Sequence, residues 1–203
     1  MKIVRALCAL LVLLVASPER LANADTAPAP AFTSSGELVR PADYREWVFL
    51  TSGLGMTYGP AKPRDGEPRS FDNVFVTRPA YRQFLQSGTW PQGTMFVLEI
   101  RRGEANVSIN NDGRTQGRIV ALEAAVKDAR RFPAGGWGYF SFDVDEGPGE
   151  TTRALPASES CYTCHRANTA VDNTFVQFYP TLLEVAKRLG TIRKDYDPKK
   201  KAG

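Results

Sequence analysis

The segment from Thr94 to Asp128, "TMFVLEIRRGEANVSINNDGRTQGRIVALEAAVKD", decides the class of fold. Apolar residues alternate through its first part, residues 94–100, and again through its last part, residues 117–128. A period of two residues is typical of β-strands. Between the two parts lies "NNDG", a sequence that favours a turn. The segment therefore predicts two antiparallel strands joined by a turn.

The same pattern continues on both sides. "FDNVFVT" at 71–77 alternates in the same way, and "GWGYFSFDV" at 136–144 adds an aromatic strand. The turns "PQG" and "PAGG" leave no room for a full crossover helix between the later strands, which favours antiparallel pairing. We predict an α+β fold with an antiparallel β-sheet and flanking helices.

Three segments are predicted to be helices: 41–53, 79–88 and 180–190. Each begins with proline, which is tolerated at the first helical position, and each ends at glycine. Apolar residues recur at helical spacing in all three, so we expect these faces to pack in the core.

The N-terminus predicts export. Lys2 and Arg5 precede an apolar run, and a small-x-small site ends at Ala24. Residues 1–24 therefore resemble a secretory signal peptide, and the run is too short to span a bilayer. We expect a soluble periplasmic protein with a flexible segment at 25–38, one folded domain at 39–192 and a polar basic tail at 193–203. The formal net charge of +4, lowered further by cleavage, argues against nucleic acid as a partner.

The sequence "CYTCH" at 161–165 contains the one histidine of the chain, His165, behind Cys161 and Cys164. Structural zinc normally needs four ligands, and three are present. A thioredoxin-like redox pair would follow a buried strand, which "TTRALPASES" does not resemble. A disulfide between the two cysteines would leave the adjacent histidine unexplained.

Covalent haem explains all three residues. Each thiol can bond one haem vinyl group, and the following imidazole can bind iron. The motif predicts a monohaem c-type cytochrome domain at 39–192, with one haem c attached through Cys161 and Cys164 and with His165 as the proximal iron ligand.

A single histidine excludes bis-histidine ligation. An electron carrier would need another sixth ligand, for which the mature chain offers Met56 and Met95. Met56 lies in a glycine-rich loop, and Met95 shares a strand with aliphatic residues. An open sixth position is the leading hypothesis, and it suits small ligands such as NO, CO or hydroxylamine.

The order of "YREW", "NVFVTRPAYRQF", "SGTWPQGTMFVLEIR", "CYTCH" and "TFVQFYPTL" resembles the cytochrome P-460 family, which includes the cytochromes c′-beta. The likeness runs from about residue 44 to residue 190. It implies a mostly β monohaem protein, commonly a homodimer, with His165 as proximal ligand and an aromatic distal pocket. Members with a modified haem oxidise hydroxylamine and NO, whereas the c′-beta members bind NO and CO.

One departure from the family concerns lysine. The resemblance implies a haem-bonded lysine near the turn at 88–94 in the hydroxylamine-oxidising members. Here no lysine occurs between Lys62 and Lys127, which counts against such a crosslink.

Three hypotheses follow for the function. The first is binding or detoxification of NO, the second is hydroxylamine or NO oxidation, and the third is electron transfer through a methionine-ligated haem to a soluble partner. Strand parity favours Phe75 and Phe96 in the distal pocket. Oxidation would need a proton-accepting carboxylate; the carboxylates that precede the motif, expected to be solvated, are Asp143, Asp145, Glu146, Glu150 and Glu159.

Overall fold

A computed structural model describes residues 30–57, 69–145 and 147–199. Its centre is a five-stranded sheet whose strands lie in chain order, each antiparallel to its neighbours. The strands are β2 (Val48–Leu54), β3 (Ser70–Val76), β4 (Met95–Glu104), β5 (Thr115–Lys127) and β6 (Trp137–Phe142). The antiparallel sheet expected from the sequence is confirmed.

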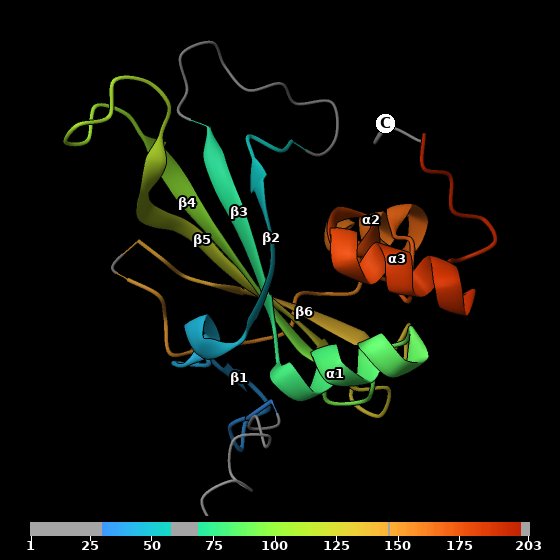
Figure 1. Cartoon of the computed structure of the whole chain (residues 1–203). Helices are drawn as coiled ribbons and strands as arrows, with labels where there is room; N and C mark the ends of the chain where they lie inside the picture. Colours follow the sequence, from blue (N-terminus) through green and yellow to red (C-terminus); the bar gives the residue numbers. More distant parts are fainter. Residues whose placement is uncertain (1–29, 58–68, 146, 200–203) are drawn as a thin grey trace, which may run out of the picture.

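Helices cover one face of this sheet. They are α1 (Arg78–Ser87), α2 (Ser160–Asn168), the short 3-10 helix η3 (Val176–Phe178) and α3 (Pro180–Leu189). Figure 1 shows all three α-helices on the same side of the sheet. The fold is therefore α+β, as predicted.

The other face is covered by short elements. These are the 3-10 helix η2 (Tyr44–Glu46) and a two-stranded sheet of β1 (Leu38–Val39) and β7 (Thr151–Thr152). A separate apolar cluster fills this side, including Val97, Leu122 and Phe140. Side chains alternate between the two faces along each strand. Successive residues of a strand therefore pack in different layers, one under the helices and the other under the short elements.

Two of the three predicted helices are confirmed. α1 and α3 have proline in the first turn, and they end at Gly88 and Gly190, each with φ of 68°. Glycine adopts this left-handed conformation without the steric cost that other residues meet. A side chain at Gly88 would also collide with the Thr191 hydroxyl, because an added Cβ would lie 2.6 Å from Oγ1.

The helix predicted at 41–53 is wrong. The segment forms only η2 and then enters β2, which pairs with β3 from Val48 to Leu54. Tyr44 and Trp47 are buried, and the Tyr44 hydroxyl donates to Glu99 at 2.5 Å. The β-branched and aromatic residues after Trp47 favour a strand, and pairing with β3 outweighs the helical spacing.

The N-terminal segment predicted to be flexible is packed where the structure describes it. Phe32 contacts Phe140, with ring centroids 6.2 Å apart, and Leu38 is fully buried. Both side chains are apolar and pack in the core. The Ala- and Pro-rich composition around them gave no indication of this packing. The predicted signal peptide at 1–24 lies outside the described residues.

The predicted polar tail is also ordered in its first residues. The Arg193 amide donates to the Ala170 carbonyl at 2.9 Å, and the Arg193 guanidinium reaches the Arg166 carbonyl. Within the described ranges, none of the helices has the length and apolar character needed to cross a bilayer.

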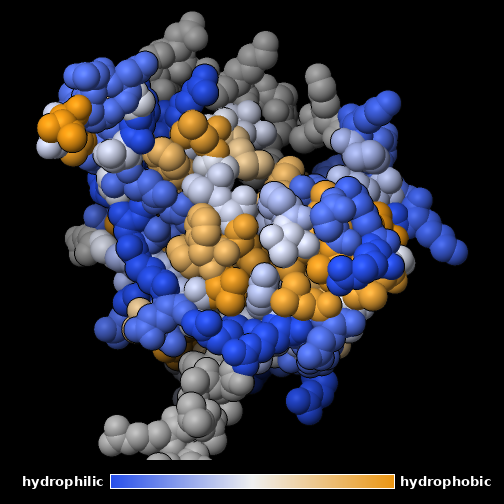
Figure 2. Space-filling model, in the orientation of Figure 1, coloured by the Kyte–Doolittle hydropathy of each residue, from blue (hydrophilic) through white to orange (hydrophobic). Residues whose placement is uncertain are grey.

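Apolar side chains also reach the surface. Figure 2 shows them gathered along β2 and between α1 and α3. Phe49 on β2 and Leu189 on α3 are exposed by 53% and 40%.

Phe84 provides a test of the helical layer. It is fully buried on α1 and lies against Trp90, with ring centroids 4.2 Å apart. Phe84→Ala should lower the free energy of unfolding by about 3–5 kcal/mol, measured by urea denaturation of the holoprotein. Phe49→Ala is the matched control at an exposed position and should cost less than about 1 kcal/mol. Equal losses in the two variants would contradict this packing.

Candidate haem site

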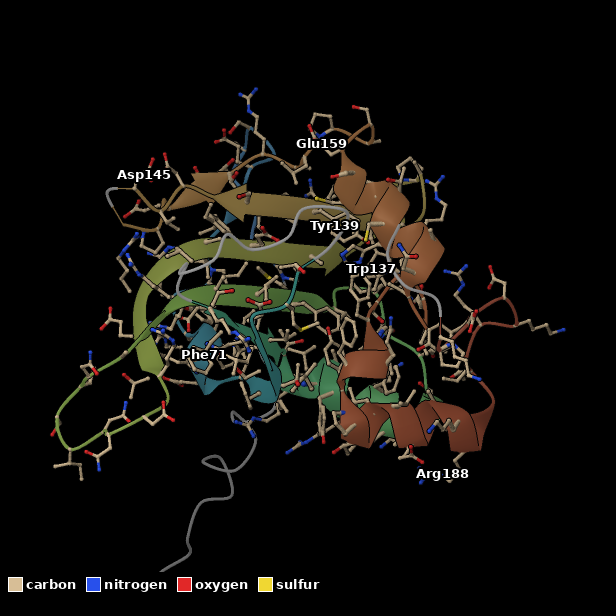
Figure 3. The ribbon with its side chains drawn as sticks, turned by 90° about the horizontal axis from the view of Figure 1, so that it is seen from above. Phe71, Trp137, Tyr139, Asp145, Glu159 and Arg188 are labelled. Atoms are coloured by element: carbon tan, nitrogen blue, oxygen red, sulfur yellow. The ribbon has the colours of Figure 1, made fainter. Side chains whose placement is uncertain are left out.

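A cavity of about 820 Å³ lies between the helical layer and the sheet. One wall is formed by residues of β2 to β6, and the other by α2 and the segment 173–179. The volume falls within the roughly 300–1,000 Å³ typical of small-molecule sites. Figure 3 shows Tyr139 and Trp137 of β6 beside α2.

Helix α2 brings the three motif residues to this cavity. Cys164 and His165 lie three and four positions after Cys161, so both are on the same side of the helix as Cys161. All three line the cavity. The two thiols are not joined by a disulfide.

The imidazole of His165 is held in one orientation. Its Nδ1 lies 2.8 Å from the carbonyl oxygen of Asn173, and because a carbonyl only accepts, Nδ1 is the protonated nitrogen. The Tyr139 and Phe175 rings pack on the imidazole at centroid distances of 4.4 and 4.6 Å. Nε2 therefore keeps its lone pair for a metal.

Burial also favours the neutral imidazole. It lowers the pKa of His165, and the hydrogen bond to the Asn173 carbonyl acts in the opposite direction. A metal needs neutral imidazole, so this environment suits ligation.

The sheet wall is mostly apolar. Val74, Phe96, Leu98 and Ala125 line it from three strands. Small ligands of low polarity would meet aliphatic and aromatic carbon on this side.

Two carboxylates interrupt this wall. Asp72 on β3 is 7% exposed, and Glu123 on β5 is half-buried. Burial raises the pKa of Glu123, and the nearby charge of Asp72 raises it further. Burial also raises the pKa of Asp72, against the effect of the hydrogen bond from Ser70. The cavity wall thus contains two carboxylates whose raised pKa values favour the uptake of protons.

These carboxylates were missed in the sequence. Asp143, Asp145, Glu150 and Glu159 are exposed and do not line the cavity, and Glu146 lies outside the described residues. Figure 3 shows Asp145 at the end of the sheet away from α2. The alternation within β3 and β5 does not single out these two residues, because Ser70 shares a strand face with Asp72 and Lys127 shares one with Glu123.

The structure separates the candidates for the distal side. Phe96 lines the cavity, whereas Phe75 lies on the opposite face of the sheet against Tyr44, with ring centroids 5.5 Å apart. Met56 also lines the cavity. Met95 is 3% exposed in the cluster on the other face, so it is not placed to reach a group in the cavity.

The positions of the lysines decide whether one could form the lysine–haem crosslink that the resemblance implies for other members. Among the described residues, no lysine lines the cavity. Lys127 is engaged elsewhere: its Nζ donates to Asp172 at 2.5 Å and to the Trp90 carbonyl at 2.7 Å. Lys62 lies outside the described residues.

The residues present fit a covalent haem. Two free thiols and an imidazole with an available Nε2 line one wall of a cavity of suitable volume, and an apolar wall faces them. This donor set defines the class of protein as a c-type cytochrome.

Comparison with known proteins identifies the family. A model described as Cytochrome P460 matches residues 41–176, which include the whole Cys161–His165 motif. The chain belongs to the cytochrome P460 family, whose members are c-type haem proteins related to cytochromes that process hydroxylamine and NO. One covalently attached haem c is its cofactor. No curated protein matches the chain.

The role of His165 can be tested without losing the haem. We expect His165→Gly to retain covalent haem, because both thiols remain, but to lose the visible spectrum of an imidazole-ligated iron. Added imidazole should restore that spectrum by entering the space left by the side chain. Arg166→Ala, at an exposed position of α2 that does not line the cavity, is the control and should leave the spectrum unchanged. A wild-type spectrum in His165→Gly without imidazole would assign the ligand elsewhere.

Proposed function

We propose that this protein binds NO and related small ligands at an open distal face of its haem. One observation supports this most strongly: the cavity wall across from α2 is mostly apolar and cannot contain a second imidazole, because His165 is the one histidine of the chain. In this proposal Cys161 and Cys164 would hold the haem through thioether bonds, and His165 Nε2 would ligate the iron. The bound haem supplies an open coordination position and one-electron chemistry.

The wall residues would select the ligand. Phe96 and Leu98 offer a small molecule apolar contact and exclude water. Asp72 and Glu123, when ionised, repel anions, so neutral NO and CO are favoured over nitrite.

Met56 allows this proposal to be distinguished from an electron carrier. The Met56 sulfur packs where Gly53 has no side chain, since an added Cβ there would lie 2.2 Å from Sδ. Met56→Leu keeps the apolar volume and removes the sulfur. We expect a high-spin ferric spectrum in both wild type and variant, and CO binding to both after reduction. A low-spin wild-type spectrum that becomes high-spin in Met56→Leu would instead support electron transfer.

Oxidation of hydroxylamine is the second candidate, favoured by the two carboxylates in the cavity. Removing electrons from hydroxylamine also releases protons, and a positioned carboxylate can accept them. Glu123 and Asp72 lie on the wall where such a substrate would be held. The electrons would pass to an external one-electron acceptor.

This candidate predicts a pH dependence. A proton acceptor works in its ionised form, so the oxidation rate should fall as the pH drops through the pKa of Glu123. Because burial raises that pKa, the loss should begin above the range of an exposed glutamate, whose pKa is about 4.3.

Glu123→Gln keeps the size of the side chain and should lower the rate by about 10²–10⁴-fold, in a steady-state assay with an artificial acceptor. CO affinity, measured by titration of the reduced variant, should stay within a few-fold of wild type. The exposed Glu159→Gln is the control. Wild-type oxidation no faster than that of free haem would remove the enzyme hypothesis and leave ligand binding.

We further propose export to the periplasm through residues 1–24 and assembly as a homodimer. Cell fractionation and sedimentation of the mature protein test these two points; cytoplasmic retention or a purely monomeric species would contradict them.

A further inference from the structure

The carbonyl that accepts the His165 hydrogen bond belongs to a tight turn. Val171 and Thr174 form a bridge, and Asp172 and Asn173 between them have φ of 46° and 55°. Positive φ at both central residues is the signature of a type I′ turn. Asp and Asn tolerate this conformation better than most residues, but it still costs free energy compared with extended backbone. Contacts from outside the turn must hold it.

One such contact is an ion pair. Lys127 Nζ, at the end of β5, donates to Asp172 Oδ2 at 2.5 Å, and the exposed fractions of the two side chains are 16% and 29%. The same ammonium donates to the Trp90 carbonyl. Lys127 thus ties the turn to the sheet and to the loop before β4.

Weaker contacts surround this pair. The Trp137 indole approaches Asp172 Oδ1 at 3.5 Å, and the Tyr139 hydroxyl approaches the Asn173 carbonyl at the same distance. The Trp90 indole donates to the Thr174 hydroxyl at 2.8 Å. The ion pair is the one link in this set between opposite full charges.

We infer that Lys127 and Asp172 are positioning residues for the proximal imidazole: their ion pair fixes the turn that aims the Asn173 carbonyl at His165 Nδ1. The inference rests on the proposed role of His165 as iron ligand. A hydrogen bond from Nδ1–H raises the basicity of Nε2 and strengthens its bond to the metal. A more basic ligand stabilises ferric iron, so the ion pair keeps the reduction potential low.

Variants that break the Lys127–Asp172 pair distinguish an effect of turn positioning on the reduction potential from an effect of charge alone. Lys127→Met removes a positive charge, Asp172→Asn removes a negative charge, and the double variant restores neutrality. If charge alone mattered, the first would lower the potential, the second would raise it, and the double variant would match wild type. Positioning predicts that all three raise the potential, because each loosens the same hydrogen bond.

The experiment measures the reduction potential and the iron–histidine stretching frequency of the ferrous holoprotein by resonance Raman spectroscopy. We expect a lower frequency and a higher potential in all three variants, with Lys127→Arg close to wild type. Lys187→Met removes the same charge from an exposed ion pair on α3 and is the control. A loss of stability alone would not shift the frequency of the folded protein.

Two results would overturn the inference: an unchanged frequency in Lys127→Met and Asp172→Asn, or potential shifts of opposite sign that cancel in the double variant. Failure of the proposed open site gives a different result, namely the absence of an iron–histidine band in the wild type. In that case the potentials of the three variants decide the inference alone.

Discussion

The hydrogen bond between His165 Nδ1 and the Asn173 carbonyl is the constraint on which the haem site depends. It joins α2 to the turn that follows it, and it determines which imidazole nitrogen remains available to iron. Without it the ring could rotate about its side-chain bonds, and Nε2 would no longer be held in one direction for a metal. The Tyr139 and Phe175 rings support the same orientation by packing on the imidazole.

The alternation of side chains along each strand determines which sheet residues line the rest of the site. On β3, Asp72 and Val74 face the cavity, while Phe75 faces the opposite cluster. On β4 the same division sends Phe96 to the cavity and Met95 away from it. A one-residue shift in pairing would exchange these sets and place methionine and a different aromatic residue beside the haem. The register of β3 with β4 therefore determines the chemistry of the distal wall as directly as any single residue does.

Much of this arrangement could be predicted from the sequence. Period-two alternation indicated strands β3 to β6, proline and glycine marked α1 and α3, and the cysteine spacing predicted haem. The prediction for segment 41–53 was wrong because its apolar residues have helical spacing, whereas its β-branched residues favour a strand. Pairing with β3, which local patterns do not show, decides for the strand. Glu123 and Asp72 were missed because a carboxylate within a strand is usually solvated, and no local pattern reveals that a helix will cover it. The turn at Asp172 and Asn173 depends on Lys127, which lies too far away in sequence for local patterns to link them.

We propose above that the imidazole of His165 is the proximal ligand of the haem iron, and this assignment can be measured directly. Because the chain contains one histidine, ¹⁵N-histidine labelling of an untagged protein places the label at a single side chain. Electron–nuclear double resonance on the ferric holoprotein then reports directly on that side chain. We expect hyperfine coupling from one directly coordinated ¹⁵N nucleus, together with a weaker coupling from the remote ring nitrogen. A spectrum without strong ¹⁵N coupling would contradict it.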